Sequence, residues 1–151
     1  MIEGVKVKKL DTHNDERGFF REILRDDDRL LSRFGQISIS LTKSGVIKAF
    51  HWHKSQDDVF CVISGTALVG LYDLRKRSRT NGQKMALLLD ERDPKVVVIP
   101  RQVAHGYKAM GKKPLFMMYI MSRSYNRKKP DEQRISFDDD RIGFDWSGKG
   151  E

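Results

Sequence analysis

Three of the four histidines in this 151-residue chain lie in two short patterns that can form one site. His51 and His53 are separated by one residue, and the acidic residues Asp57 and Asp58 follow closely. Side chains alternate between the two faces of a β-strand, so His51 and His53 would point the same way. His105 follows a proline turn farther along the chain. Imidazole and carboxylate groups together can ligate a transition metal or exchange protons with a substrate, and spacing alone leaves both open.

The segments that carry these residues are predicted to be strands. Short apolar or alternating runs, separated by polar turns that contain glycine, occur along most of the chain. The expected strands are 5–10, 18–24, 36–42, 46–53, 59–64, 67–74, 84–89, 95–99, 105–109 and 115–122. Because strands and helices do not alternate, this pattern predicts an all-β antiparallel sandwich or small barrel. One short helix is expected near residues 26–34, where three aspartates precede an apolar pair and Gly35 supplies a stop.

Composition predicts a single domain over residues 1–151 with its own hydrophobic core. The chain is 38% hydrophobic and 33% charged, which is typical of a soluble globular protein. It contains no apolar run of the length that crosses a bilayer, so no membrane partner is expected. The first residues lack an apolar signal segment, and the single cysteine, Cys61, lies in an apolar run. These features favour a cytoplasmic location.

The net charge of +8 allows several kinds of anionic partner. The basic residues are dispersed, and the densest groups fall in expected loops, at residues 75–77, 112–113 and 127–129. Neither a nucleic-acid-binding motif nor a basic stripe interleaved with aromatic residues is present, so no nucleic acid partner is expected. The charge therefore indicates a solvated basic surface or attraction to a small phosphate-bearing ligand.

The first histidine pattern resembles the first metal motif of the cupin β-barrels. From Gly45 to Gly65 it reads Gly-x5-His-x-His, an acidic residue and a final glycine, with aspartate where glutamate is usual. Pro100 and His105 match the second motif, although Ala109 holds the place of its final asparagine. This resemblance implies a cupin-type jelly roll, or double-stranded β-helix barrel. It also implies a divalent transition metal as one alternative, with ligands drawn from His51, His53, Asp57, Asp58 and His105.

A second series of motifs falls in order along nearly the whole chain. The series comprises DERGFFRE at 15–22, GQISIS at 35–40, GVIKAFH at 45–51, YDLR at 72–75, AHGY at 104–107, MY at 118–119 and IGFDW at 142–146. In these stretches the chain resembles the dTDP-4-dehydrorhamnose 3,5-epimerases, a family of sugar-nucleotide epimerases. The resemblance implies an isomerase that acts on a nucleotide-diphosphate 4-keto-6-deoxyhexose, needs no cofactor and works as a homodimer with exchanged strands.

The same resemblance implies a role for individual residues. His51 takes the position of the general base, Tyr119 that of the general acid, and His105 that of a second active-site histidine. Some of the implied substrate-binding residues would reach a neighbouring subunit. The implied substrate-binding residues are Arg17, Phe20, Glu22, Gln36, Lys48 and Tyr125.

The chemistry explains why these residue types are needed. The carbonyl of a 4-keto sugar acidifies the C–H bonds at C3 and C5, so a base can remove a proton and an acid can return one on the opposite face. The enolate oxygen needs a donor, and such a group is worth about 3 kcal/mol. The family places a lysine there, whereas this chain has Asp58, and the family's arginine before the base is Lys48. The alternative is therefore a divergent metal-binding cupin, either an enzyme on another small polar substrate or a sugar-binding module.

Overall fold

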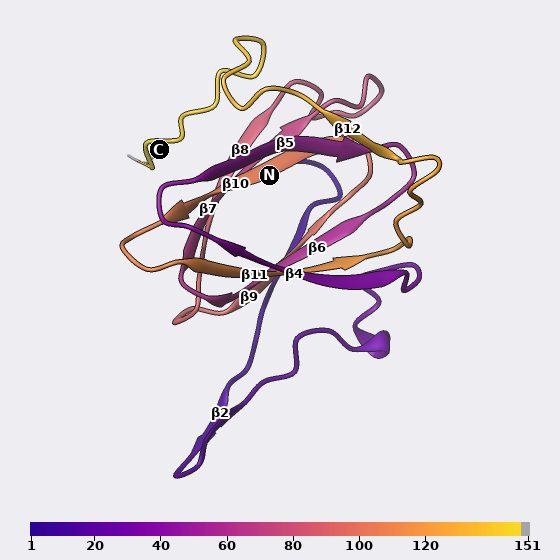
Figure 1. Cartoon of the computed structure of the whole chain (residues 1–151). Helices are drawn as coiled ribbons and strands as arrows, with labels where there is room; N and C mark the ends of the chain where they lie inside the picture. Colours follow the sequence, from indigo (N-terminus) through magenta and orange to yellow (C-terminus); the bar gives the residue numbers. More distant parts are fainter. Residues whose placement is uncertain (149–151) are drawn as a thin grey trace.

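Two antiparallel five-stranded sheets face each other in the computed structural model, which describes residues 1–148 (Figure 1). The first sheet has the strand order β1-β9-β6-β11-β4 and the second β12-β5-β10-β7-β8. The strands are β1 (Lys6–Lys9), β2 (His13–Asp15), β3 (Gly18–Phe20), β4 (Gln36–Thr42), β5 (Ile47–His53), β6 (Asp58–Ser64), β7 (Thr66–Asp73), β8 (Lys84–Asp90), β9 (Lys95–Ile99), β10 (Val103–Met110), β11 (Leu115–Met121) and β12 (Glu132–Arg134). The predicted all-β antiparallel architecture is confirmed.

The continuous apolar sequences of β6 and β9 reflect burial on both faces of the first sheet. Phe60 and Val62 point into the core between the two sheets. Val59 and Cys61 point the other way, into a second cluster that the segment around Leu30 covers. Both faces of these strands therefore exclude water, which makes the first sheet a rigid wall for the space between the sheets.

The pairing of β5 with β10 contains an irregularity that orients the site. His51 lies opposite His105 and Lys48 lies opposite Tyr107, with a register shift between the two pairs. Opposed residues of an antiparallel pair share a face, so Lys48 and His51 both point inward although they are an odd number of positions apart. Gly106 allows β10 to lie close to Ala49 of β5 at this point, because a Cβ added at Gly106 would lie 2.2 Å from the Ala49 Cβ.

The predicted helix over residues 26–34 is wrong. Only a single 3₁₀ turn, η1 (Asp26–Asp28), forms there, and Arg29 ends it in the left-handed conformation at φ 51°. Asp28 is drawn to Lys8 by an ion pair of 2.6 Å, and Leu30 packs on the outer cluster of the first sheet. These tertiary contacts override the local helical pattern. None of the helices in the described part of the chain is long and apolar enough to span a membrane.

Two elements, a hairpin arm outside the two main sheets and a short edge strand, differ from the prediction. The predicted strand over 18–24 is shorter and pairs with β2 to form a hairpin arm, β2–β3, that projects away from the body (Figure 1). All residues of the two arm strands are exposed. The short strand β12 joins the edge of the second sheet beside β5. Neither strand carries the apolar alternation from which the longer strands were predicted.

The C-terminal segment covers the outer face of the second sheet. Phe144 and Trp146 pack on each other and on Phe50. Their rings lie against Gly70, where an added Cβ would meet both at 2.9 Å. Trp52 belongs to this outer cluster, so it points away from the two histidines that flank it. The inner face of β5 is thereby left to His51 and His53.

Candidate active site

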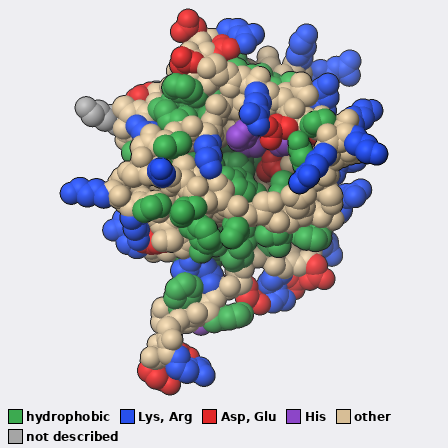
Figure 2. Space-filling model, viewed as in Figure 1, with side chains coloured by type: hydrophobic (Ala, Val, Ile, Leu, Met, Phe, Trp, Pro, Cys, Tyr) green, Lys and Arg blue, Asp and Glu red, His purple; other side chains and the backbone are tan. Residues whose placement is uncertain are grey.

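A cavity of about 770 Å³ opens between the two sheets. Its lining includes side chains of β4, β5, β6, β10 and β11 and of the segment that leads into β12. Figure 2 shows it as a hollow that contains histidine and acidic side chains, with lysine and arginine side chains around its rim. The lining includes His51, His53, Asp58, Phe60, His105 and Tyr119. The inner faces of both sheets therefore contribute to one chamber.

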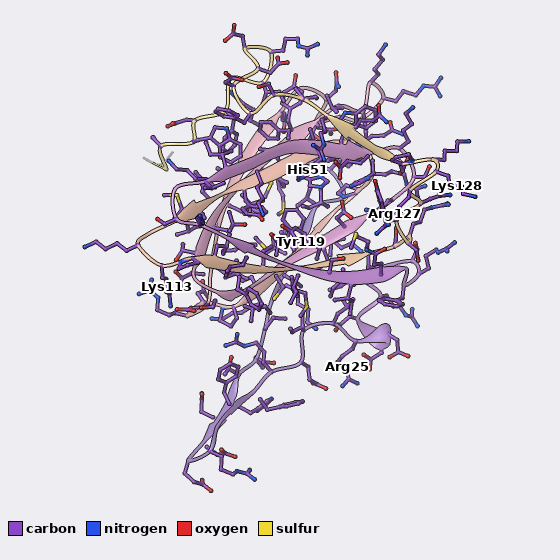
Figure 3. All side chains as sticks on the ribbon, viewed as in Figure 1. Arg25, His51, Lys113, Tyr119, Arg127 and Lys128 are labelled. Carbon is purple, nitrogen blue, oxygen red and sulfur yellow. The ribbon has the colours of Figure 1, made fainter. Side chains whose placement is uncertain are left out.

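His51 and Tyr119 project into this chamber from opposite sheets (Figure 3). Burial, reinforced by the electrostatic effect of His105, lowers the pKa of His51 to about 4. His51 is therefore a neutral imidazole at neutral pH, with a lone pair that can accept a proton. Burial and the hydrogen bond to Tyr107 raise the pKa of Tyr119 above its usual range. Tyr119 therefore keeps its proton, and the two side chains form a neutral base facing a neutral acid.

A buried carboxylate joins the other two histidines at the base of the chamber. Asp58 Oδ2 lies 3.2 Å from His53 Nε2 and 3.1 Å from His105 Nε2, while Oδ1 accepts a hydrogen bond of 2.7 Å from Gln56 Nε2. Burial opposes ionisation of Asp58, but the hydrogen bonds from His105 and His53 outweigh it and hold its pKa well below the usual range. Burial likewise opposes the charged form of His53, and Asp58 outweighs it, so the pKa of His53 is raised. Asp58 is therefore a buried carboxylate that pairs with His53 when this histidine is protonated.

Three of the five predicted metal ligands come together in this cluster. Donor atoms of His53, Asp58 and His105 all lie within 4.8 Å of one another. The ring Nδ1 of His105 is 2.9 Å from the Val103 carbonyl, an arrangement that would leave Nε2 free for a metal. Two imidazoles and a carboxylate fit a divalent transition metal in kind, although in the structure the same atoms are joined by hydrogen bonds. His51 is outside this set of three.

Asp57, the other predicted acidic ligand, lies apart from the cluster. Its Oδ1 accepts a hydrogen bond of 2.9 Å from the backbone N–H of Arg101. The backbone N–H of Asp57 donates to Ser122 Oγ at 2.8 Å. Asp57 thus fastens the entrance of β6 to neighbouring segments, and Asp58 is the acidic residue that reaches the histidines.

Tyr119 is the centre of a chain of polar groups in the wall of the chamber. Its hydroxyl lies 2.6 Å from that of Tyr107, which lies 3.0 Å from Thr42 Oγ1. The Ser40 hydroxyl has the opposite effect to Tyr107 and lowers the pKa of Tyr119, and Lys48 Nζ donates to Ser40 Oγ at 2.7 Å. Lys48, expected to bind substrate, is not among the described residues that line the chamber. The structure places it behind the candidate acid instead.

The sequence of this chain matches a known protein family over its whole length. The family model described as dTDP-4-dehydrorhamnose 3,5-epimerase matches residues 1–151. The chain belongs to this family. Membership confirms the predicted family and the assignment to the isomerase class.

Individual relatives of the epimerase agree with this assignment. The chain is 51% identical over 147 residues to the spore coat polysaccharide biosynthesis protein SpsL of Bacillus subtilis, covering 97% of each chain. It superposes with a TM-score of 0.90 on a dTDP sugar isomerase from Desulfovibrio desulfuricans, at 28% identity and over 99% of this chain and 94% of the other. The 3,5-epimerase RmlC of Legionella pneumophila, solved with dTDP-4-keto-L-rhamnose, superposes with a TM-score of 0.87 at 25% identity. The match covers 97% of this chain and 80% of the other. The predicted jelly roll is thereby confirmed.

Two of the implied substrate-binding residues of the epimerase lie at the rim of the chamber. Gln36 Oε1 accepts a hydrogen bond of 2.8 Å from the backbone N–H of Tyr125, and both residues line the opening. Basic residues lie beside them, and of these the sequence indicated only Lys129, as part of the basic group at 127–129; the only signal of the others was the dispersed positive charge. These residues are Arg33, Lys54, Arg123 and Lys129. Their charges suit a phosphate-bearing ligand at the entrance.

The other implied binding residues of the epimerase lie on or just after the hairpin arm. Arg17 pairs with Asp15 at 2.6 Å, and Glu22 pairs with Arg25 at 2.8 Å. Phe20 is 64% exposed at the end of β3. None of the three is among the described residues that line the chamber of their own chain. A role for them in substrate binding therefore requires a second copy of the chain.

Proposed function

We propose that this epimerase inverts a carbon next to the keto group of a dTDP-linked 4-keto-6-deoxy sugar by acid–base catalysis. The observation that carries the proposal is the neutral His51 facing the protonated Tyr119 across one chamber. The dTDP-4-keto-L-rhamnose held by the Legionella relative supports the substrate class. The free, buried Cys61 thiol supports the cytoplasmic location predicted from the sequence.

The proposed reaction divides between the two faces of the sugar. The imidazole nitrogen of His51 takes the proton from C3 or C5, and the electron pair of the broken C–H bond moves into an enolate. The hydroxyl of Tyr119 then gives its proton to the same carbon from the opposite face, which inverts the configuration. Enclosure between the two sheets keeps water from protonating the enolate without stereochemical control.

The basic rim gives a site for the diphosphate. Arg33, Lys54, Arg123 and Lys129 surround the opening, and guanidinium and ammonium groups make strong charge-assisted hydrogen bonds to phosphate oxygens. With the diphosphate at the rim, the attached sugar would extend inward to His51 and Tyr119. The shape of the chamber and the position of its charges therefore fit one orientation of a sugar nucleotide.

The proposal is tested by NMR of dTDP-4-keto-6-deoxyglucose with the protein in D₂O. Deuterium at C3 or C5, together with inverted product, is the expected result and identifies the carbon. His51→Asn and Tyr119→Phe should each lower turnover by ~10²-fold or more. Tyr72→Phe is the matched control, because Tyr72 belongs to the outer aromatic cluster and should leave turnover unchanged. Near-normal turnover in both site variants would refute the assignment.

A homodimer is part of the proposal, because one chain leaves an apolar surface uncovered. Ile37, Ile39 and Leu41 on the edge strand β4 are each more than half exposed, as are Phe19 and Phe20 on the arm. Figure 2 shows hydrophobic side chains across the face between the chamber and the arm. An isolated two-stranded hairpin is marginal in water, so a second copy would stabilise the arm. Sedimentation should give a dimer that Ile39→Glu weakens, and a monomeric wild type would contradict this.

A metal-dependent epimerase is the second candidate, favoured by the cluster of His53, Asp58 and His105. A divalent metal held there would act as a Lewis acid toward the keto oxygen. The deciding measurements are the metal content of the purified protein and deuterium exchange after EDTA treatment. Exchange that EDTA leaves unchanged supports the metal-free reaction, whereas exchange lost with EDTA and restored by one metal supports the second candidate. Stabilisation by the sugar nucleotide without any exchange would indicate a binding module.

A further inference from the structure

We propose that Lys48 and Ser40 form a proton relay that recharges Tyr119 after it has protonated the substrate, an inference that rests on the proposed role of Tyr119 as the acid. Lys48 Nζ donates to Ser40 Oγ at 2.7 Å, and Ser40 is two residues from Ser38, the strand partner of Tyr119, so it lies on the same face of the sheet as the Tyr119 phenol. The three groups come from β5, β4 and β11, so the relay joins the two sheets beside the chamber.

The hydrogen-bonding capacity of these groups fixes the direction of the relay. A lysine ammonium has three donors and no acceptor, so Lys48 must donate to Ser40. The single hydroxyl hydrogen of Ser40 is then available for the oxygen of Tyr119, and a donated hydrogen bond favours the phenolate. The hydrogen of Tyr119 is left for Tyr107 when substrate is absent, and for the substrate carbon when it is present. All three links therefore point toward the reacting centre.

Such a relay addresses a difficulty that the site otherwise has. Proton transfer to the substrate breaks the Tyr119 O–H bond and leaves a phenolate whose surroundings are mostly buried, and burial disfavours that charge. In the proposed relay the proton of Ser40 moves to Tyr119 as one from Lys48 moves to Ser40. Lys48 is left as a neutral amine and regains a proton from water. His51 loses to solvent the proton that it took from the sugar, so the cycle closes without net proton uptake.

The fold places Lys48 for this role and not for direct contact with the sugar. The register shift between β5 and β10 turns Lys48 inward, opposite Tyr107. Ser40 lies opposite Met117, two pairs along from the Tyr119–Ser38 pair and therefore on the same face of the sheet. Lys48 is not among the described residues that line the chamber, whereas Tyr119 is. We therefore regard Lys48 and Ser40 as positioning residues that act through Tyr119.

The test separates the base half of the reaction from the acid half. In D₂O, His51 can exchange the substrate proton for deuterium without inversion, whereas inversion requires Tyr119. Lys48→Met and Ser40→Ala should slow inversion by ~10-fold or more while exchange stays within about threefold of the wild type and KM is unchanged. Lys48→Arg keeps a cationic donor and should recover most of the inversion rate. Lys84→Met is the matched control. Lys84 begins β8, away from the chamber, and its ammonium donates one hydrogen bond to the Gly143 carbonyl.

The possible outcomes distinguish the relay from other roles of Lys48. A raised KM at unchanged kcat would assign Lys48 to substrate binding, and an equal loss of exchange and inversion would assign it to the fold; both overturn the relay. Melting temperatures of the variants are measured alongside, and Ser40→Ala carries the test if Lys48→Met does not fold. A wild type without any exchange would refute the proposed function, and exchange in a wild type whose variants behave normally would refute the relay alone.

Discussion

The carboxylate of Asp58 should hold the base of the chamber together, and Asp58→Asn tests this with little change in size. The side chain is 5% exposed and accepts hydrogen bonds on both oxygens. An amide has one acceptor oxygen and one NH₂ group. Whichever way the new amide is turned, its NH₂ would face a donor: either Gln56 Nε2 or the two histidine ring nitrogens. The substitution therefore removes the negative charge and forces Gln56 or the two imidazoles to turn an acceptor toward residue 58.

The size of the effect follows from the burial of the pair. Removal of one partner from a buried ion pair typically costs about 3–5 kcal/mol. Because the amide keeps one acceptor, we expect the lower end, about 3 kcal/mol of unfolding free energy. For a chain of this length that corresponds to a melting temperature lower by about 6–12 °C. Activity should fall as well, because His105 and His53 lose the group that orients them.

The pH dependence of this difference is fixed by two pKa shifts. The pKa of Asp58 is lowered from 3.8 on folding, so its contribution is present above pH 3.8 and is lost as the pH falls through the lower folded value. The pKa of His53 is raised from 6.5, so its contribution is present below pH 6.5 and is lost as the pH rises through the folded value. The stability gap between the wild type and Asp58→Asn should therefore be widest between pH 4 and pH 6.5 and narrow above it.

The assay is urea unfolding at a fixed protein concentration with EDTA present, at pH 5.5 and pH 8.5. Asp57→Asn is the matched control, because Asp57 is the neighbouring acidic residue and its ion pair with Arg101 is long, at 3.8 Å, and half-exposed on the arginine side. A surface pair of that kind is worth less than about 1 kcal/mol. A loss below about 1 kcal/mol for Asp58→Asn at pH 5.5, or a gap that widens at pH 8.5, would refute the reasoning.

Three further predictions follow from individual side chains. The pH profile of kcat/KM should be level at neutral pH and fall about tenfold per pH unit below the His51 pKa of about 4, because the base must be neutral; an acid limb near pH 6.5 would contradict this. Burial raises the pKa of the Cys61 thiol to about 11, so a thiol reagent at pH 8 should label the protein only after unfolding, and rapid labelling of the native form would oppose this account. Gly106→Ala should lower the free energy of unfolding in urea by more than about 3 kcal/mol, because its Cβ would meet Ala49. Gly111→Ala, strained only by its φ of +76°, should lower it by about 1 kcal/mol. Equal losses would contradict this, since they would mean that β5 moves away from the new methyl group.

Much of the barrel could be predicted because its strands carry their own signal. Strands β4 and β9 have the predicted bounds, and the other long strands differ by one or two residues at an end. The bounds of these long strands could be predicted from apolar alternation or from a continuous apolar sequence, since burial in a sheet requires one or the other. The short strands β2 and β12 are polar and hold their shape only by pairing. The residues around Leu30 form no helix, because contacts with the first sheet decide their path.

The candidate site was predictable in part for the same reason. Alternation along β5 indicates that His51 and His53 share a face, and the structure places both in the chamber. The sequence could not decide between Asp57 and Asp58, because that choice depends on where β6 begins. Nor could it show that Lys48 turns inward, since this follows from the register shift against β10. Long-range pairing supplied what local periodicity could not.

The sequence resemblance implies a lysine beside the keto oxygen where this chain has Asp58. His105 has its Nε2 beside Asp58 and its Nδ1 beside the Val103 carbonyl, so both ring nitrogens are engaged within the protein. His53 Nε2 also faces Asp58. Within the described residues, three of the four ring nitrogens of this cluster therefore face protein acceptors, and the buried His53 Nδ1 is left without a hydrogen-bond partner. The proposed relay from Lys48 brings a cation to the acid side of the chamber, where negative charge next develops as Tyr119 gives up its proton. A chain with Asp58 in this place can thus still limit the lifetime of an enolate, because prompt protonation by a recharged Tyr119 removes the negative charge from the sugar.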